Sequence, residues 1–245
     1  MLLLPKISIT VLKKITNYKS MITDVYFDLD HTLWDFEKNS ALAFEEIFKK
    51  HKINVDINDY LKLYVPINVQ YWDWYRNEKI TQAELQIGRL KDTLGLLNYE
   101  IDDQKLHFLA DEYAVYLPKY NHLFDGCIEI LEYLKPKYKL HIITNGFQNI
   151  QDGKMKNSGL LPYFETITNS EMAGCKKPNP KIFEHSLALK NVKKENAIMI
   201  GDCLDADVGG ALKFGIDAIW FNEHQKEISS NTKQVHYLID LKNFL

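Results

Sequence analysis

Residues 22–32 read ITDVYFDLDHT, a mostly apolar run followed by two aspartates separated by one residue. The run has the length and the β-branched and aromatic content of a buried strand, so we predict a strand that ends just before Asp28. Side chains alternate along an extended chain, and Asp28 and Asp30 should therefore emerge on the same side, at the mouth of a sheet. Two carboxylates this close repel each other unless a cation joins them, and their hard oxygen atoms suit Mg²⁺. Taken alone, the stretch is equally consistent with a solvated acidic turn.

Four further apolar runs of strand length follow, separated by stretches with helical periodicity. They are residues 140–143, 164–168, 197–200 and 218–221. Buried strands that alternate with amphipathic helices are typical of an α/β fold with a parallel, doubly wound sheet.

The first two predicted strands are separated by more than a hundred residues, which hold helical patterns at 40–50, 58–76, 81–97 and 102–117. A connection between parallel strands needs only a dozen or so residues, so we predict an inserted α-helical cap. The expected division is a core of residues 21–35 and 121–245, a cap of residues 36–120, and an N-terminal extension of residues 1–20. Both joints of the cap should lie beside the carboxyl end of the first strand, where open α/β sheets bind ligands.

Polar side chains follow the later strands in the same way. Thr144 and Asn145 follow the second strand and offer a hydroxyl and an amide to phosphate oxygens. Lys177 lies in a Pro-containing loop after the third strand, and Asp202 and Asp207 follow the fourth. The carboxyl ends of parallel strands meet at one edge of a sheet, so we expect these groups to lie together.

These four groups of polar residues, each after a predicted strand, resemble in their order the motifs of the haloacid dehalogenase superfamily. The resemblance spans essentially all of residues 22–245. It implies that Asp28 is the nucleophile that forms an aspartyl-phosphate, and that Asp30 is the general acid and base. Thr144 and Lys177 would position the phosphate. Carboxylate nucleophiles divide phosphoryl transfer into two easier steps, while cations offset the charge on the phosphoryl oxygens.

The same resemblance implies a Mg²⁺ site made by Asp28, Asp202 and the main-chain carbonyl of Asp30, with Asp207 supporting these ligands from behind. Dehalogenases of the superfamily lack the acid–base aspartate, so Asp30 favours a phosphomonoester over a 2-haloacid as substrate. One departure is Cys203, where relatives commonly have Ser.

The predicted insertion resembles class I caps, and its pattern is similar to the pyrimidine 5′-nucleotidases of the YjjG and YfnB group. The residues that carry this likeness are Asn68, Trp72, Tyr75, Ile80, Thr81, Leu85, Gln86, Gly88 and Arg89. It implies a pyrimidine nucleoside 5′-monophosphate as the substrate. Five aromatic side chains could stack on a base: Trp34, Tyr71, Trp72, Trp74 and Phe147. The alternative is that they form the core of the cap. Arg89 could contact a substrate or lie on the helix surface.

The bulk composition limits the alternatives. A net charge of -3 and a pI near 6.2 argue against a nucleic-acid polymer or a membrane as the partner, and favour a small phosphorylated metabolite. Three cysteines without a CxxC pair suit reduced thiols, so we expect a cytoplasmic protein. Three other functions stay open: a phosphatase of phosphoglycolate or a sugar phosphate, a 2-haloacid dehalogenase, and a noncatalytic binding protein.

Overall fold

The computed structural model describes residues 22–227 and 232–245; the predicted extension of residues 1–20 lies outside this part. Its centre is a six-stranded, fully parallel sheet in the order β3-β2-β1-β4-β5-β6. The strands are β1 (Asp24–Phe27), β2 (Lys139–Thr144), β3 (Thr166–Asn169), β4 (Ala197–Gly201), β5 (Asp217–Phe221) and β6 (Gln234–Val235). The predicted α/β fold is confirmed, with β6 as an added, two-residue edge strand.

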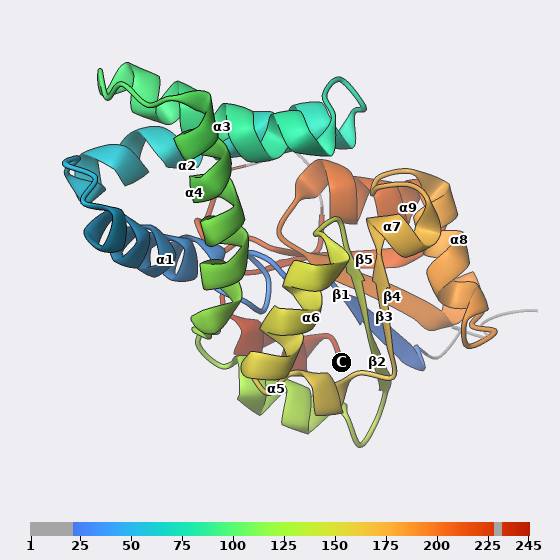
Figure 1. Ribbon diagram of the computed structural model, residues 1–245. Coiled ribbons are helices and arrows are strands. Elements are labelled where there is room, and N and C mark those ends of the chain that lie inside the picture. The colour runs from blue at the N-terminus through green and yellow to red at the C-terminus, as the bar shows by residue number, and fades with distance from the viewer. Residues whose placement is uncertain (1–21, 228–231) are drawn as a thin grey trace, which may run out of the picture.

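β1 lies in the middle of the sheet, and both of its faces are covered. Val25 and Phe27 pack in one apolar cluster with Leu131, whereas Tyr26 packs in a second with Phe183. The first face carries α5 (Cys127–Leu134) and α6 (Gln148–Asn157). The second face carries α8 (Pro180–Ala188) and α9 (Gly210–Phe214), as Figure 1 shows. Burial on both sides explains why the strands read as continuous apolar runs.

The insertion between β1 and β2 contains the four predicted helices, so the helical cap is confirmed as an element of the fold. They are α1 (Phe36–His51), α2 (Ile57–Arg76), α3 (Gln82–Leu96) and α4 (Asp103–Tyr116). Each begins after a side chain that accepts a hydrogen bond from a main-chain N–H of the first turn: Asp35, Asp56, Thr81 and Asp102. The aromatic rings of Phe44, Tyr60, Tyr64 and Tyr113 pack together between the helices. The insertion lies beyond one end of the sheet (Figure 1).

Two chain segments, residues 34–39 and 122–123, join the insertion to the sheet and are hydrogen-bonded to each other. We call these two segments the joint. The main-chain N–H of Asp35 donates to the carbonyl of His122 at 3.1 Å. The buried Asn39 amide donates to the carbonyls of Asp35 and His122 at 2.7 and 2.8 Å, and accepts from the His122 N–H at 2.9 Å. Trp34 forms an antiparallel bridge with Leu123. The insertion therefore leaves and re-enters the core at one place.

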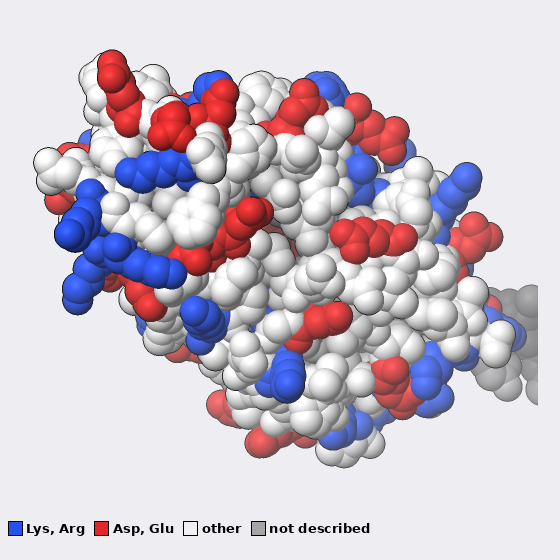
Figure 2. Space-filling view, in the orientation of Figure 1, with Lys and Arg blue, Asp and Glu red and all other residues white. Residues whose placement is uncertain are grey.

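The face of the molecule drawn in Figure 2 carries no dominant charge. On the side drawn in Figure 2, Lys and Arg are interspersed with Asp and Glu. Across residues 22–227 and 232–245, none of the helices has both the length and the apolar character that crossing a bilayer requires.

Candidate active site

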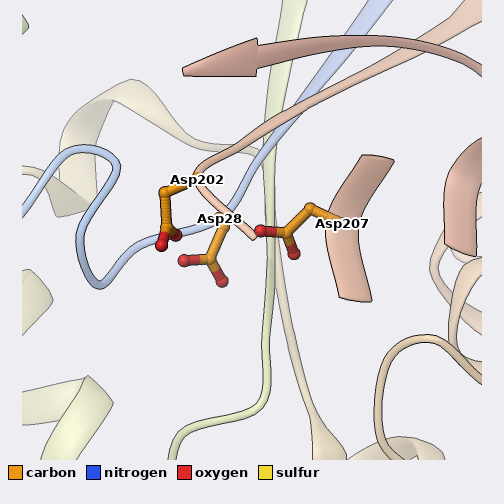
Figure 3. Close-up of side chains that lie close together, drawn as sticks. All are labelled: Asp28, Asp202 and Asp207. Carbon is orange, nitrogen blue, oxygen red and sulfur yellow. The ribbon is translucent and has the colours of Figure 1, made fainter. Parts of the chain in front are cut away.

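Three carboxylates meet where β1 and β4 end. Asp28 directly follows β1, Asp202 follows β4, and Asp207 lies on the π-helix Leu204–Gly209. One oxygen from each can be chosen so that all three lie within 4.8 Å of one another. Figure 3 shows the side chains gathered in one spot. Three hard oxygen donors at this spacing form a set that could hold a divalent metal ion such as Mg²⁺.

The neighbouring residues fix the position of this cluster. A Cβ atom at Gly201 would lie 2.3 Å from Oδ2 of Asp207, so only glycine lets that carboxylate approach the strand. The buried Thr32 hydroxyl accepts from the N–H of Asp202 at 3.1 Å and donates to its Oδ1 at 3.3 Å. The Trp220 indole donates to the Asp202 carbonyl at 2.7 Å. Thr32 and Trp220 are therefore site residues that the motif search did not assign.

Lys177 contacts two of the three carboxylates. Its ammonium is buried and lies 2.5 Å from Oδ1 of Asp28 and 2.7 Å from Oδ1 of Asp207; it also donates to the Ile143 carbonyl at 2.5 Å. The Asn145 side chain holds the main chain of Lys177 from both directions: Oδ1 accepts from its N–H at 2.7 Å and Nδ2 donates to its carbonyl at 3.0 Å. In this structure Asn145 thus uses its side chain to place Lys177.

Burial and mutual repulsion shift the pKa values of the charged groups in the cluster. Burial raises the pKa of Asp28 well above its usual range, although the Lys177 ammonium opposes the shift. Burial, and then the charge of Asp207, raise the pKa of Asp202 to about 7. Burial alone would lower the pKa of Lys177, but Asp207 and Asp28 more than offset this and raise it. Three carboxylates facing one ammonium leave room for added positive charge.

Asp30 points to a different set of partners, on α6. Lys154 Nζ lies 2.5 Å from its Oδ1, and Gln151 Nε2 donates to its Oδ2 at 2.8 Å. Lys154 is buried, and its ammonium lies over the rings of Trp34 and Phe36 at 4.3 and 5.3 Å from their centres. Gln151 and Lys154 were not predicted as site residues. Their spacing of three on a helix that starts just after Gly146 is the only signal that could have suggested them.

Thr144 is set up to donate a hydrogen bond. Its Oγ1 accepts from Gln151 Nε2 at 2.7 Å and from the Gly146 N–H at 3.1 Å. A hydroxyl oxygen with two donors on it directs its own hydrogen elsewhere. The hydroxyl of Thr144, which lines the cavity described next, is thus free to donate to an oxygen anion.

The predicted site residues share one cavity of about 390 Å³ between the sheet and the insertion. Those that line it are Asp28, Asp30, Thr144, Asn145, Lys177, Asp202 and Asp207. The insertion contributes Phe36, Glu37, Asn68, Val69, Trp72 and Arg76. The volume lies within the range of small-molecule sites, about 300–1,000 Å³.

Of the five aromatic side chains considered for stacking, only Trp72 lines this cavity. Trp34 has no exposed surface, and Phe147 is buried against Trp72. Tyr71 and Trp74 pack edge to face on each other, with ring centres 5.0 Å apart. The other four rings pack against protein side chains, but Trp34 and Phe147 lie outside residues 36–120 and so do not belong to the cap.

Comparisons with known proteins agree with this geometry. A family model described as haloacid dehalogenase-like hydrolase matches residues 25–221. Pyrimidine 5′-nucleotidase PynA of Streptococcus pneumoniae is 33% identical over 89% of this chain and 92% of its own length. Pyrimidine 5′-nucleotidase YjjG of Escherichia coli is 29% identical over 83% of this chain and 87% of its own length. The crystal structure of the HAD-hydrolase YfnB from Bacillus subtilis, bound to magnesium, superimposes with a TM-score of 0.84 at 30% identity, covering 92% of this chain and 99% of that one.

Proposed function

Because the chain belongs to the family of haloacid dehalogenase-like hydrolases and is a phosphatase of that family, we propose that it hydrolyses pyrimidine nucleoside 5′-monophosphates through an aspartyl-phosphate on Asp28. We divide the chain accordingly into a catalytic core, residues 21–35 and 121–245, and a cap, residues 36–120. The nucleotide proposal rests on the match to PynA, which covers 89% of this chain and 92% of PynA. The cavity supports it, because Thr144 and Lys177 line its core wall, and its cap wall combines apolar side chains with the polar side chains of Glu37, Asn68 and Arg76.

The donor set fits Mg²⁺. Asp28, Asp202 and the main-chain carbonyl of Asp30 are the ligands we propose, and the ion would supply positive charge for the phosphoryl oxygens. Asp207 contacts Lys177 and accepts from the N–H of Cys203 at 3.0 Å, which supports a role for it behind the metal ligands rather than in the reaction. The solved relative bound to magnesium supports the same metal.

The positions of the core residues support the following roles. Asp28 attacks phosphorus, and the P–O bond to the leaving oxygen breaks. Asp30 gives that oxygen its proton, and afterwards takes one from the water that attacks the aspartyl-phosphate and regenerates the Asp28 carboxylate. Thr144 donates to one phosphoryl oxygen while Lys177 neutralises charge on another. Lys154 and Gln151 orient the Asp30 carboxylate.

The substrate is tested by phosphate release from a panel of compounds with Mg²⁺, with the Asp28→Asn protein as the blank. The panel contains pyrimidine and purine nucleoside monophosphates, phosphoglycolate and sugar phosphates. We expect kcat/KM for dUMP, UMP or dTMP to exceed that for the other compounds by at least about tenfold. A preference for a sugar phosphate or phosphoglycolate would keep the mechanism and discard the nucleotide.

Metal binding should depend on pH, because Mg²⁺ and protons compete for the same carboxylates. With its pKa raised to about 7, Asp202 is largely protonated below pH 6 in the metal-free protein and must lose that proton to bind the ion. Affinity should therefore rise with pH as Asp202 loses its proton. From Asp202 alone, we expect a dissociation constant about tenfold larger at pH 6 than at pH 8.

Calorimetric titration of Mg²⁺ at pH 6, in buffers of different ionisation enthalpy, measures the protons released. The Asp202→Asn variant should release fewer protons and bind Mg²⁺ more weakly. Asp205→Asn makes the same chemical change at an exposed position three residues away and should match the unmodified protein. Equal Mg²⁺ affinity in Asp202→Asn and Asp205→Asn would remove Asp202 from the ligand set.

A further inference from the structure

A buried amide on the cap faces the cavity with a fixed orientation. Asn68, on α2, lines the cavity and is 5% exposed. Arg89 donates from Nη1 to Oδ1 of Asn68 at 2.6 Å, and the Tyr64 hydroxyl donates to the same oxygen at 3.4 Å. A guanidinium has only donors, so the atom facing it must be the amide oxygen. The amide nitrogen forms no hydrogen bond within residues 22–227 and 232–245, which leaves its two N–H donors for the cavity.

Apart from its hydrogen bond to Asn68, the Arg89 side chain makes few polar contacts. It is 5% exposed, does not line the cavity, and forms no ion pair with a carboxylate in the described part of the chain. Its charge lies instead near the rings of Tyr64 and Tyr113, at 5.9 and 5.4 Å from their centres. A buried cation is costly unless it is well bonded. In the described part of the chain, the Arg89 side chain donates one hydrogen bond, to Asn68, and its Nε has no partner. A cation on the amide oxygen polarises the amide and strengthens its N–H donors.

We propose that Asn68 is a specificity-determining residue that donates from Nδ2 to a carbonyl oxygen of the pyrimidine base, and that Arg89 is a positioning residue that holds the amide in this orientation. This inference rests on the proposed nucleotidase function. It adds how the base is recognised: by a hydrogen-bond acceptor on the ring, such as the oxygens of uracil and thymine.

The location of Asn68 favours the base over the phosphate as its partner. The groups that suit a phosphate, Thr144 and Lys177, belong to the core wall of the cavity. Asn68 belongs to the cap wall, beside the apolar side chains of Val69 and Trp72. Two charged residues, Glu37 and Arg76, also line the cap wall, and the Arg76 guanidinium is bonded to Asp73 at 2.7 Å. Apolar side chains beside a few directed polar groups are the usual way to orient a flat heterocycle.

The test compares two substrates that differ only by the base, dUMP and 2-deoxyribose 5-phosphate. The measured quantity is the ratio of their kcat/KM values, which cancels damage to the shared chemistry. Asn68→Asp replaces the donor with an acceptor of the same shape and keeps a partner for Arg89. We expect it to lower the ratio on the order of 100-fold, mainly through KM for dUMP. Gln70→Glu makes the same change at an exposed position on α2 and should leave the ratio unchanged.

Asn68→Ala removes the donor without adding charge, and should lower the ratio by a smaller factor, about tenfold. Arg89→Met should lower it as well, because the amide loses the bond that orients it. A merely structural role for either residue would instead reduce both substrates alike.

The two proposals fail in different ways. A ratio near one in the unmodified protein would overturn the nucleotidase function and this inference together. A high ratio in the unmodified protein that stays equally high in Asn68→Asp and in Gln70→Glu would overturn only the role of Asn68.

Discussion

Replacing Asp28 with Asn should abolish turnover, lowering kcat by on the order of 10⁴-fold or more, because the amide is not a nucleophile and no aspartyl-phosphate can form. The change also removes one negative charge from beside Asp202 and Asp207, so the fold should be retained. Kinetics of phosphate release and the thermal unfolding midpoint, measured on the same preparation, separate the two effects.

Asp125→Asn is the matched control, since Asp125 is exposed and does not line the cavity. It should behave as the unmodified protein in both measurements. A near-normal rate in the Asp28→Asn variant would refute the assignment of the nucleophile, whatever the identity of the substrate.

Replacing Asp30 with Asn should lower kcat for a nucleotide by about 10²–10⁴-fold, because the leaving oxygen and the attacking water both lose their proton-transfer partner. The two steps can be told apart with p-nitrophenyl phosphate, whose leaving group needs little protonation. In the variant we expect a burst of about one p-nitrophenolate per protein, followed by slow turnover limited by hydrolysis of the aspartyl-phosphate. Rapid-mixing absorbance measurements report both phases.

The unfolding midpoint of this variant must also be recorded, since Lys154 is buried and loses its charge partner. An Asp30→Asn protein with unchanged activity would exclude the acid–base role. A slow, burst-free reaction with an intact fold would place the defect in the first step alone and contradict a role for Asp30 in hydrolysis of the intermediate.

Most of the strands and helices could be predicted from the local pattern of apolar residues. The apolar runs correctly predict β1 to β5 because these strands are buried on both faces, and the helical periodicity correctly predicts α1 to α4 because each helix buries one side in the cap. β6 escaped prediction because it is a two-residue edge strand, Gln234–Val235, and two residues carry no periodicity. The common location of the predicted site residues follows from topology, since they all come after parallel strands.

What could not be predicted depends on side-chain direction between elements. Lys154 contacts Asp30 across 124 positions of sequence, and nothing in α6 alone distinguishes it from a surface lysine. Arg89 was open to two interpretations, a substrate contact or a surface residue, and it is neither, because three cap helices enclose it. The same limit applies to Trp34, whose position beside the site gave no sign that its ring is covered.

The joint described above has a consequence for how such a protein can acquire new substrates. The main-chain closure between the cap's two ends centres on Asn39 and His122, next to the bridge between Trp34 and Leu123, whereas the reacting groups follow the strand ends. A different helical insert would need to reproduce that short closure and the contacts of α2 with the core, such as Trp72 on Phe147 and Arg76 on Cys203, to be accepted by the same core. The cap can thus vary while the catalytic core stays the same. Transplanting caps between relatives is a practical route to a redesigned substrate range.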